Sequence, residues 1–156
     1  MAETSIGLRS VKDAEECLGK LAGIGSRHAL EVRSQILVLQ KRYEEAATIA
    51  ERAMEEVGGP LPAEIAAEAH ASIGNLEKAR ELCDIAANET LRTLDGAWID
   101  RIFCTRARIA FAEKDTAATM DNLEKAWQSA PEGRRPAYRH MIDAVSEGTD
   151  PGFQAL

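Results

Sequence analysis

The residues best suited to chemistry in this chain of 156 residues are His70 and Cys83, which lie thirteen positions apart. The expected helices place both side chains toward the interior of one helical hairpin. An imidazole and a thiolate together could hold a metal ion or form a nucleophile pair. A metal site needs three or four ligands, and no third candidate stands near them in the sequence. A buried histidine beside a small apolar cysteine is the better interpretation, so we expect no metal site and no catalytic site.

Other titratable pairs and motifs do not indicate an enzyme either. His28 and Glu31 are three residues apart, as are His140 and Asp143, and such pairs occur on any charged helix face. The Glu-x-x-His pairs of di-iron bundles are absent, as are the Gly-x-Ser-x-Gly and His-Glu-x-x-His motifs of hydrolytic enzymes. Three arginines near the last expected helix are interpreted as a solvated loop rather than a phosphate contact: Arg134, Arg135 and Arg139.

Composition and charge restrict the class of protein and its partners. The length predicts a single domain, and shares of 45% apolar and 29% charged residues are ordinary for a globular chain. A net charge of −7 argues against nucleic acid as a partner. Three cysteines do not form a disulfide framework, and neither a signal peptide nor an apolar run of membrane-spanning length is visible. We therefore expect a cytoplasmic protein that binds no cofactor, nucleic acid or membrane.

The periodicity of apolar residues is helical throughout, and it predicts an all-α fold over residues 1–156. Glycine and proline residues divide the chain at Gly58–Pro62 and at Asp95–Gly96, which read as joints between helical hairpins. The expected elements are a capping helix over 8–22, hairpins over 27–57, 62–94 and 97–131, and a C-terminal capping helix over 136–147. Residues 148–156 are expected to form a frayed tail.

The expected hairpins contain a repeated pattern of small residues. Each second helix has a small residue after its first turn and a second one seven positions later, and two copies of this pattern are 33 residues apart. A third, degenerate copy covers residues 114–126. Each first helix has a small residue twelve positions before the first of these, as required where two antiparallel helices cross closely. The small residues expected at the crossings are Ser34, Ala46, Ala53, Ala67, Ala79, Ala86, Ala107 and Ala126.

This combination of period, small residues and terminal proline resembles the tetratricopeptide repeat (TPR) family, over roughly residues 27–131. The resemblance implies a superhelical stack of antiparallel helix pairs. The sequence departs from the family pattern at the late aromatic position of the first helices, which holds Leu37, His70 and Ala110. The third copy is also offset by 40 residues rather than 33. A plain helical bundle with coincidental spacing is the alternative.

The resemblance also implies a concave groove lined by the first helix of each pair. The residues expected to form this partner-binding groove are Glu31, Gln35, Leu39, Glu64, Glu68, Arg101, Cys104, Arg108 and Phe111. One end of the groove would then be acidic and the other basic, which predicts a preferred direction for a bound peptide. The alternative is a solvated charged face without a partner.

Together these features predict a non-catalytic protein–protein interaction module that binds a peptide or helix of a partner. Such a module would act as an adapter, scaffold or chaperone, because a preformed concave surface binds without a large ordering cost. The alternative is a self-assembly module that forms homo-oligomers through the ends of its helical stack.

Overall fold

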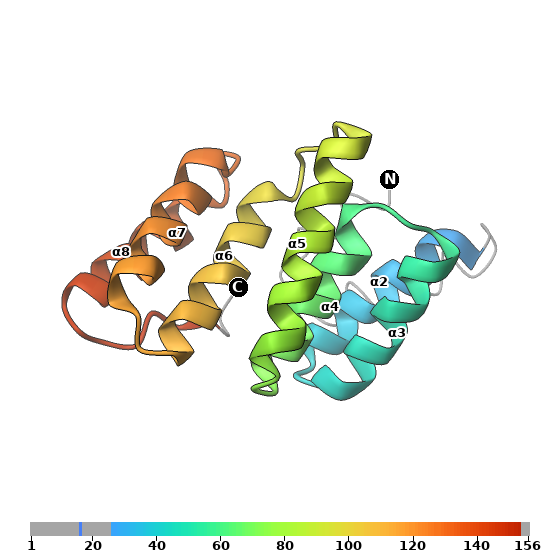
Figure 1. Ribbon diagram of the computed structural model, residues 1–156, viewed down its shortest axis with the longest axis horizontal. Coiled ribbons are helices and arrows are strands. Elements are labelled where there is room, and N and C mark those ends of the chain that lie inside the picture. The colour runs from blue at the N-terminus through green and yellow to red at the C-terminus, as the bar shows by residue number, and fades with distance from the viewer. Residues whose placement is uncertain (1–15, 17–25, 154–156) are drawn as a thin grey trace.

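The computed structural model describes residue 16 and residues 26–153, and the regular structure in that part of the chain is entirely helical (Figure 1). The fold is therefore all-α, as the periodicity predicted. The expected helix over residues 8–22 lies outside the described residues apart from Glu16. None of the described helices is long and apolar enough to cross a membrane. The helices are α2 (Ser26–Leu39), α3 (Tyr43–Glu56), α4 (Pro60–Ser72), α5 (Leu76–Thr93), α6 (Ile99–Ala112), α7 (Thr116–Ser129) and α8 (Arg135–Ser146).

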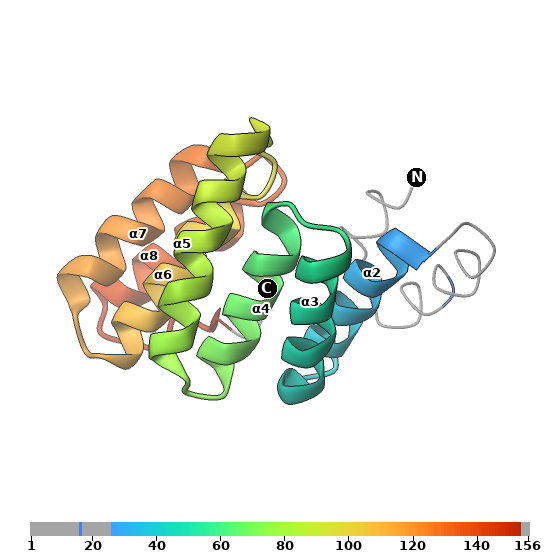
Figure 2. The same ribbon diagram turned by 45° about the vertical axis from the view of Figure 1, so that its right-hand side comes forward.

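Consecutive helices pack against each other in pairs, and the pairs follow one another along the molecule (Figures 1 and 2). Helix α2 packs on α3, α4 on α5, and α6 on α7, while α8 packs on α7. The first helices of the pairs also meet, because α4 contacts both α2 and α6. Residues far apart in the sequence are thereby brought onto one surface formed by α2, α4 and α6.

The turn inside each of these three pairs has the same backbone geometry. One residue adopts the left-handed conformation, with φ values of 59°, 83° and 63° at Lys41, Gly74 and Lys114. The amide of the next residue then donates to the carbonyl five positions earlier, at 2.8–2.9 Å, as in a Schellman helix terminus. The three bonds are Arg42 to Leu37, Asn75 to His70 and Asp115 to Ala110. The turn therefore repeats although only one of its three copies contains glycine.

The eight small residues expected at the helix crossings are all fully buried. They allow the backbones of neighbouring helices to approach closely, since a larger side chain would hold them apart. Larger side chains such as Ile65, Leu82, Ile102 and Leu123 fill the spaces between the crossings. The core is thus built from alternating close contacts and bulky apolar residues.

The segment after α8 is packed, and the expectation of a frayed tail is wrong for residues 149–153. Pro151 and Phe153 are both buried. The amide of Thr149 donates to the carbonyl of Ala144 at 2.9 Å, and the amide of Gly152 donates to the carboxylate of Asp150 at 2.8 Å. Periodicity could not reveal this segment, because two isolated apolar residues in an extended chain produce no helical pattern.

The left-handed turn residues predict the effect of two alanine substitutions that add the same methyl group. Gly74→Ala should lower the free energy of unfolding by about 1 kcal/mol, because φ is 83° there and the added carbon meets no atom within 4 Å. Gly96→Ala also meets no atom within 4 Å but lacks the positive φ, so it should be neutral or slightly stabilising. Urea denaturation of both variants checks this, and equal losses would contradict the backbone explanation.

The burial of Ala79 predicts that this helix crossing does not tolerate a larger residue. Ala79→Leu should destabilise the fold by about 1–3 kcal/mol through overpacking. The matched substitution Glu77→Leu, two positions away on the exposed face of α5, should be nearly neutral. Thermal unfolding of the two variants measures the difference, and similar midpoints would mean that α4 and α5 do not cross at Ala79.

Candidate functional site

The nine residues expected to line a groove all lie on the three first helices, and we call them the α2–α4–α6 surface. Their exposure differs widely along this surface. The side chains of Leu39 and Phe111 are exposed, by 43% and 40%, whereas Glu64 and Cys104 are buried. The remaining members are partly buried: Glu31, Gln35, Glu68, Arg101 and Arg108. The accessible part of the surface is therefore its edge at the C-terminal ends of α2 and α6.

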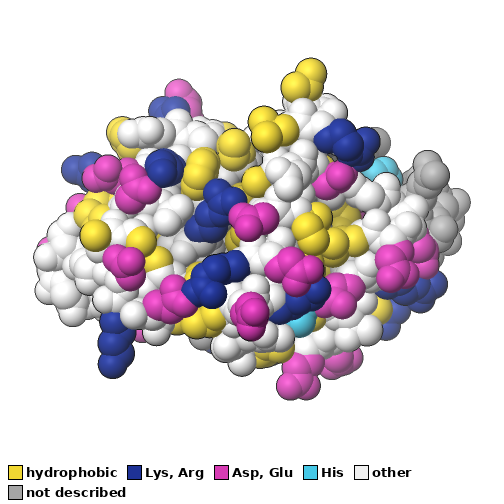
Figure 3. Space-filling model, in the orientation of Figure 1, with side chains coloured by type: hydrophobic (Ala, Val, Ile, Leu, Met, Phe, Trp, Pro, Cys, Tyr) yellow, Lys and Arg dark blue, Asp and Glu magenta, His cyan; other side chains and the backbone are white. Residues whose placement is uncertain are grey.

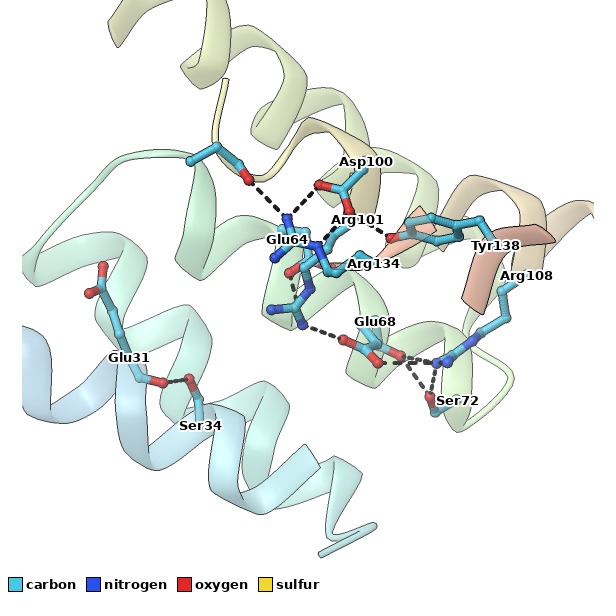
Figure 4. Close-up of polar contacts among 11 residues, drawn as sticks. Glu31, Ser34, Glu64, Glu68, Ser72, Asp100, Arg101, Arg108, Arg134 and Tyr138 are labelled. Atoms are coloured by element: carbon cyan, nitrogen blue, oxygen red, sulfur yellow. Dashed lines mark hydrogen bonds and ion pairs between the residues drawn. The ribbon is translucent and has the colours of Figure 1, made fainter. Parts of the chain in front are cut away.

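The charged residues of α4 and α6 form ion pairs with each other across the surface (Figure 4). Arg101 Nη2 lies 2.9 Å from Glu68 Oε2 and 3.4 Å from Glu64 Oε2. Arg108 Nη2 lies 3.6 Å from the other oxygen of Glu68. The expected division into an acidic end and a basic end is therefore wrong, because opposite charges on adjacent helices neutralise each other. Spacing along one helix does not reveal this pairing between two helices.

Glu64 is the most deeply buried charged residue of the surface, with 1% of its area exposed. Neither of its carboxylate oxygens accepts a hydrogen bond within the described part of the chain. Burial raises the pKa of Glu64 to about 7, although the positive charge of Arg101 works in the opposite direction. Burial alone would lower the pKa of Arg101, but the carboxylates of Glu64 and Glu68 outweigh it and raise that pKa. The Glu64 carboxyl is therefore poised to change its charge near neutral pH.

Arg108 connects α6 to α4 and to the segment that follows α8. Its Nη1 donates to Ser72 Oγ at 2.6 Å, and its Nη2 donates to the backbone carbonyl of Phe153 at 2.5 Å. The guanidinium carbon lies 5.8 Å from the centroid of the Phe153 ring, and that ring is also 5.8 Å from the ring of Phe111. The Nε of Arg108 is buried, and no described residue forms a hydrogen bond with it. The guanidinium is therefore held by Ser72 of α4 and by Phe153 after α8, while Nε is the donor that no described residue uses.

A cavity of about 620 Å³ opens beside this arginine, and we call it the Phe111 pocket. Its walls come from the turn after α2, from the ends of α4 and α6, and from residues 150–153. The residues that give it its chemistry are Lys41, Ser72, Arg108, Phe111, Asp150 and Phe153. Cationic, hydroxyl and aromatic groups meet here, so the pocket can accept an apolar side chain together with a hydrogen-bond acceptor.

A second buried polar group joins α6 to α8, and sequence analysis missed it. Asp100 is fully buried and accepts hydrogen bonds from Arg134 Nε at 2.9 Å, Arg134 Nη2 at 2.8 Å and the hydroxyl of Tyr138 at 2.8 Å (Figure 4). The guanidinium carbons of Arg101 and Arg134 lie 5.6 and 5.7 Å from the centroid of the Trp98 ring. Arg134 was interpreted as part of a solvated loop, which is wrong. These hydrogen bonds hold Arg134 and Tyr138 on Asp100 and so fix α8 on α6.

His70 and Cys83 lie in different surroundings. His70 Nε2 lies 2.6 Å from Glu51 Oε1 of α3, and His70 Nδ1 lies 3.3 Å from the side-chain nitrogen Nδ2 of Asn75. The histidine thus joins α3 to α4 instead of facing the interior of the α4–α5 hairpin as expected. Burial raises the pKa of Cys83 and of Cys104 to about 12, which keeps both thiols protonated. Among the described residues, no group of three or more side chains is arranged to hold a metal ion.

The buried carboxyl of Glu64 predicts a pH dependence of stability. Its pKa is raised from the usual 4.5 to about 7, so its stabilising contribution is complete below pH 4.5 and is lost as the pH rises through 7. Glu64→Gln cannot ionise and should lack this loss. The free energy of unfolding of the variant, minus that of the wild type, should therefore rise by about 3 kcal/mol between pH 4.5 and 7.5. Urea denaturation in a pH series measures this difference, and a constant difference would contradict the assignment.

Comparison with known proteins assigns no role to the α2–α4–α6 surface. No protein-family model, no curated protein and no solved structure matches this chain. The function is therefore inferred from the surface itself.

Proposed function

We propose that this chain is a non-catalytic interaction module that binds a segment of a partner protein at the Phe111 pocket and the exposed edge of the α2–α4–α6 surface. An adapter, scaffold or chaperone would use such a surface to hold a peptide or helix. The observation that carries this proposal is the pocket itself. It is a preformed cavity of about 620 Å³ at which an exposed aromatic ring, Phe111, stands next to two cationic side chains, Lys41 and Arg108.

A preformed pocket of this kind favours binding over a purely structural role. The rigid helices on either side hold Phe111 and Arg108 in place, so little ordering cost opposes association. Two exposed apolar side chains are close in the chain to residues that line the pocket. Leu39 at the end of α2 and Ile73 directly after α4 are exposed by 43% and 44%, and they lie within two positions of Lys41 and Ser72. Contacts with these groups would supply the apolar part of the binding energy.

We further propose that the helix pairs form a TPR-like superhelical stack. The equivalent left-handed turns at Lys41, Gly74 and Lys114 support this arrangement, because they connect the two helices of each pair in the same way. The contacts of α4 with both α2 and α6 support a surface lined by first helices. Two free, buried cysteines, Cys83 and Cys104, fit a reducing compartment such as the cytoplasm.

Self-assembly is the second candidate function, and one observation favours it. Helix α5 is longer than its neighbours, and its end projects beyond them (Figure 1). Leu91 and Leu94 at this end are 74% and 89% exposed, and hydrophobic side chains gather there on the molecular surface (Figure 3). A second copy of the chain could cover this apolar end.

Substitution of one exposed apolar residue in each region separates these two functions. Peptides selected from a random phage-displayed library on the full chain should bind Phe111→Ser at least tenfold more weakly than the wild type, which corresponds to about 1.4 kcal/mol. The matched control Leu91→Ser removes a more exposed side chain far from the pocket and should leave the dissociation constant unchanged. Fluorescence polarisation measures both constants.

The opposite result would overturn the proposal. Binding that is lost in Leu91→Ser and kept in Phe111→Ser would place the interaction at the end of α5. Light scattering at several concentrations would then test whether Leu91→Ser also lowers the mass of an oligomer. Reversal of Glu64, Glu68, Arg101 or Arg108 is unsuitable for this purpose, because these residues pair with each other and hold α4 on α6.

A further inference from the structure

The segment that follows α8 already lies on the α2–α4–α6 surface. After α8 ends at Ser146, the chain turns back so that Phe153 reaches Arg108 and Phe111 of α6. Pro151 and Phe153 are buried, whereas Asp150 is exposed to solvent. Residues 150–153 thus bind to the surface in the manner of a short peptide, and we call them the tail segment.

The contacts of the tail segment identify the chemistry that the surface accepts. The aromatic ring of Phe153 lies under the guanidinium of Arg108 and against the ring of Phe111. Its backbone carbonyl accepts a hydrogen bond from Arg108, and Asp150 lines the same pocket as Lys41. The surface therefore contacts an aromatic side chain and a backbone acceptor directly, and the acidic side chain three positions earlier lies in the pocket that Lys41 also lines. Cation–π and charge-assisted contacts of this kind favour an acidic, aromatic segment over a basic one.

The tail segment does not satisfy all the groups that it covers. Arg108 Nε is buried and has no hydrogen-bond partner among residues 26–153, although Nη2 on the same guanidinium is occupied by the Phe153 carbonyl. A guanidinium offers five donors. Nη1 of Arg108 is used by the hydroxyl of Ser72 and Nη2 by the carbonyl of Phe153, so Nε is the nitrogen left for a second acceptor. The Phe111 pocket also leaves about 620 Å³ unfilled beside the segment. A segment with a second acceptor would bind this place better than the tail segment does.

We propose that the tail segment is a resident ligand of the α2–α4–α6 surface, and that a partner segment with an acidic and an aromatic residue binds by displacing it. This inference rests on the proposed function and names the kind of partner and its competitor. A partner must then bind the fraction of molecules whose tail segment is released, and its apparent affinity is reduced by that fraction. Weakening the hold of the tail segment should therefore strengthen binding of the same segment supplied separately.

The test uses the full chain and a fluorescent peptide with the sequence of residues 149–156, Thr-Asp-Pro-Gly-Phe-Gln-Ala-Leu. Phe153→Ala removes the buried ring of the resident segment and should bind this peptide at least tenfold more tightly than the wild type. Adding Phe111→Ser to that variant should abolish the gain, because the ring of Phe111 is the one against which the phenylalanine packs. A peptide with alanine in place of its phenylalanine should not bind either protein.

A milder variant keeps the test valid if Phe153→Ala unfolds the protein. Gly152→Ala strains the resident segment, because φ is 70° there, and leaves its side-chain contacts in place. It should tighten peptide binding about fivefold. Gly58→Ala is the matched control, with a φ of 71° and equally open space at the distant turn before α4, and it should change nothing.

Equal binding of the peptide to the wild type, Gly152→Ala and Gly58→Ala would overturn the inference, and so would binding to none of them. The peptides selected from the library separate this failure from that of the proposed function. If they still require Phe111 but ignore Gly152→Ala, the interaction module stands and displacement of the tail segment fails. If they bind Phe111→Ser and Gly152→Ala as tightly as they bind the wild type, both proposals fail.

Discussion

The close approach of neighbouring helices is the constraint on which the rest of this structure depends. Ser34, Ala46, Ala67 and Ala79 have no exposed area, and each lies where a bulkier residue would push two helices apart. Because the helices are close, short turns suffice to connect them, and one turn geometry serves three times. The same closeness brings α2, α4 and α6 side by side and so creates the surface on which the polar groups gather.

That surface carries charge inside a largely apolar molecule, and its organisation follows from the cost of burying charge. Arg101 and Arg108 of α6 are matched to Glu68 of α4, which offsets the loss of hydration on both sides. Glu64 lies deeper and is paired only at 3.4 Å, so its environment favours the protonated form. The groups that a partner could reach lie at the edge of the surface, where Phe111 and Arg108 line one pocket.

The sequence predicted the parts of this structure that repeat along one helix. The spacing of small and apolar residues located the helices from Ser26 to Ser146 and the small residues of the crossings. It could not predict contacts between side chains on different helices, such as Arg101 with Glu68 or His70 with Glu51, since these depend on the relative position of two elements. It also missed the packed tail, because Pro151 and Phe153 have no periodicity. Helical spacing placed Phe111 on the expected face of its helix. It could not predict the pocket beside Phe111, because the walls of that pocket come from separate segments of the chain.

The placement of Trp98 close to two guanidinium groups gives the molecule an internal optical reporter. The chain contains two tryptophans, and the other, Trp127, lies on α7 beside Arg135. The emission of an indole depends on the charges and solvent around it, and Trp98 has one arginine from α6 and one from the start of α8 within 6 Å of its ring. Separation of these two helices would remove the Arg134 cation from the surroundings of the ring. The intrinsic fluorescence of the unlabelled protein therefore reports whether its C-terminal helix remains docked.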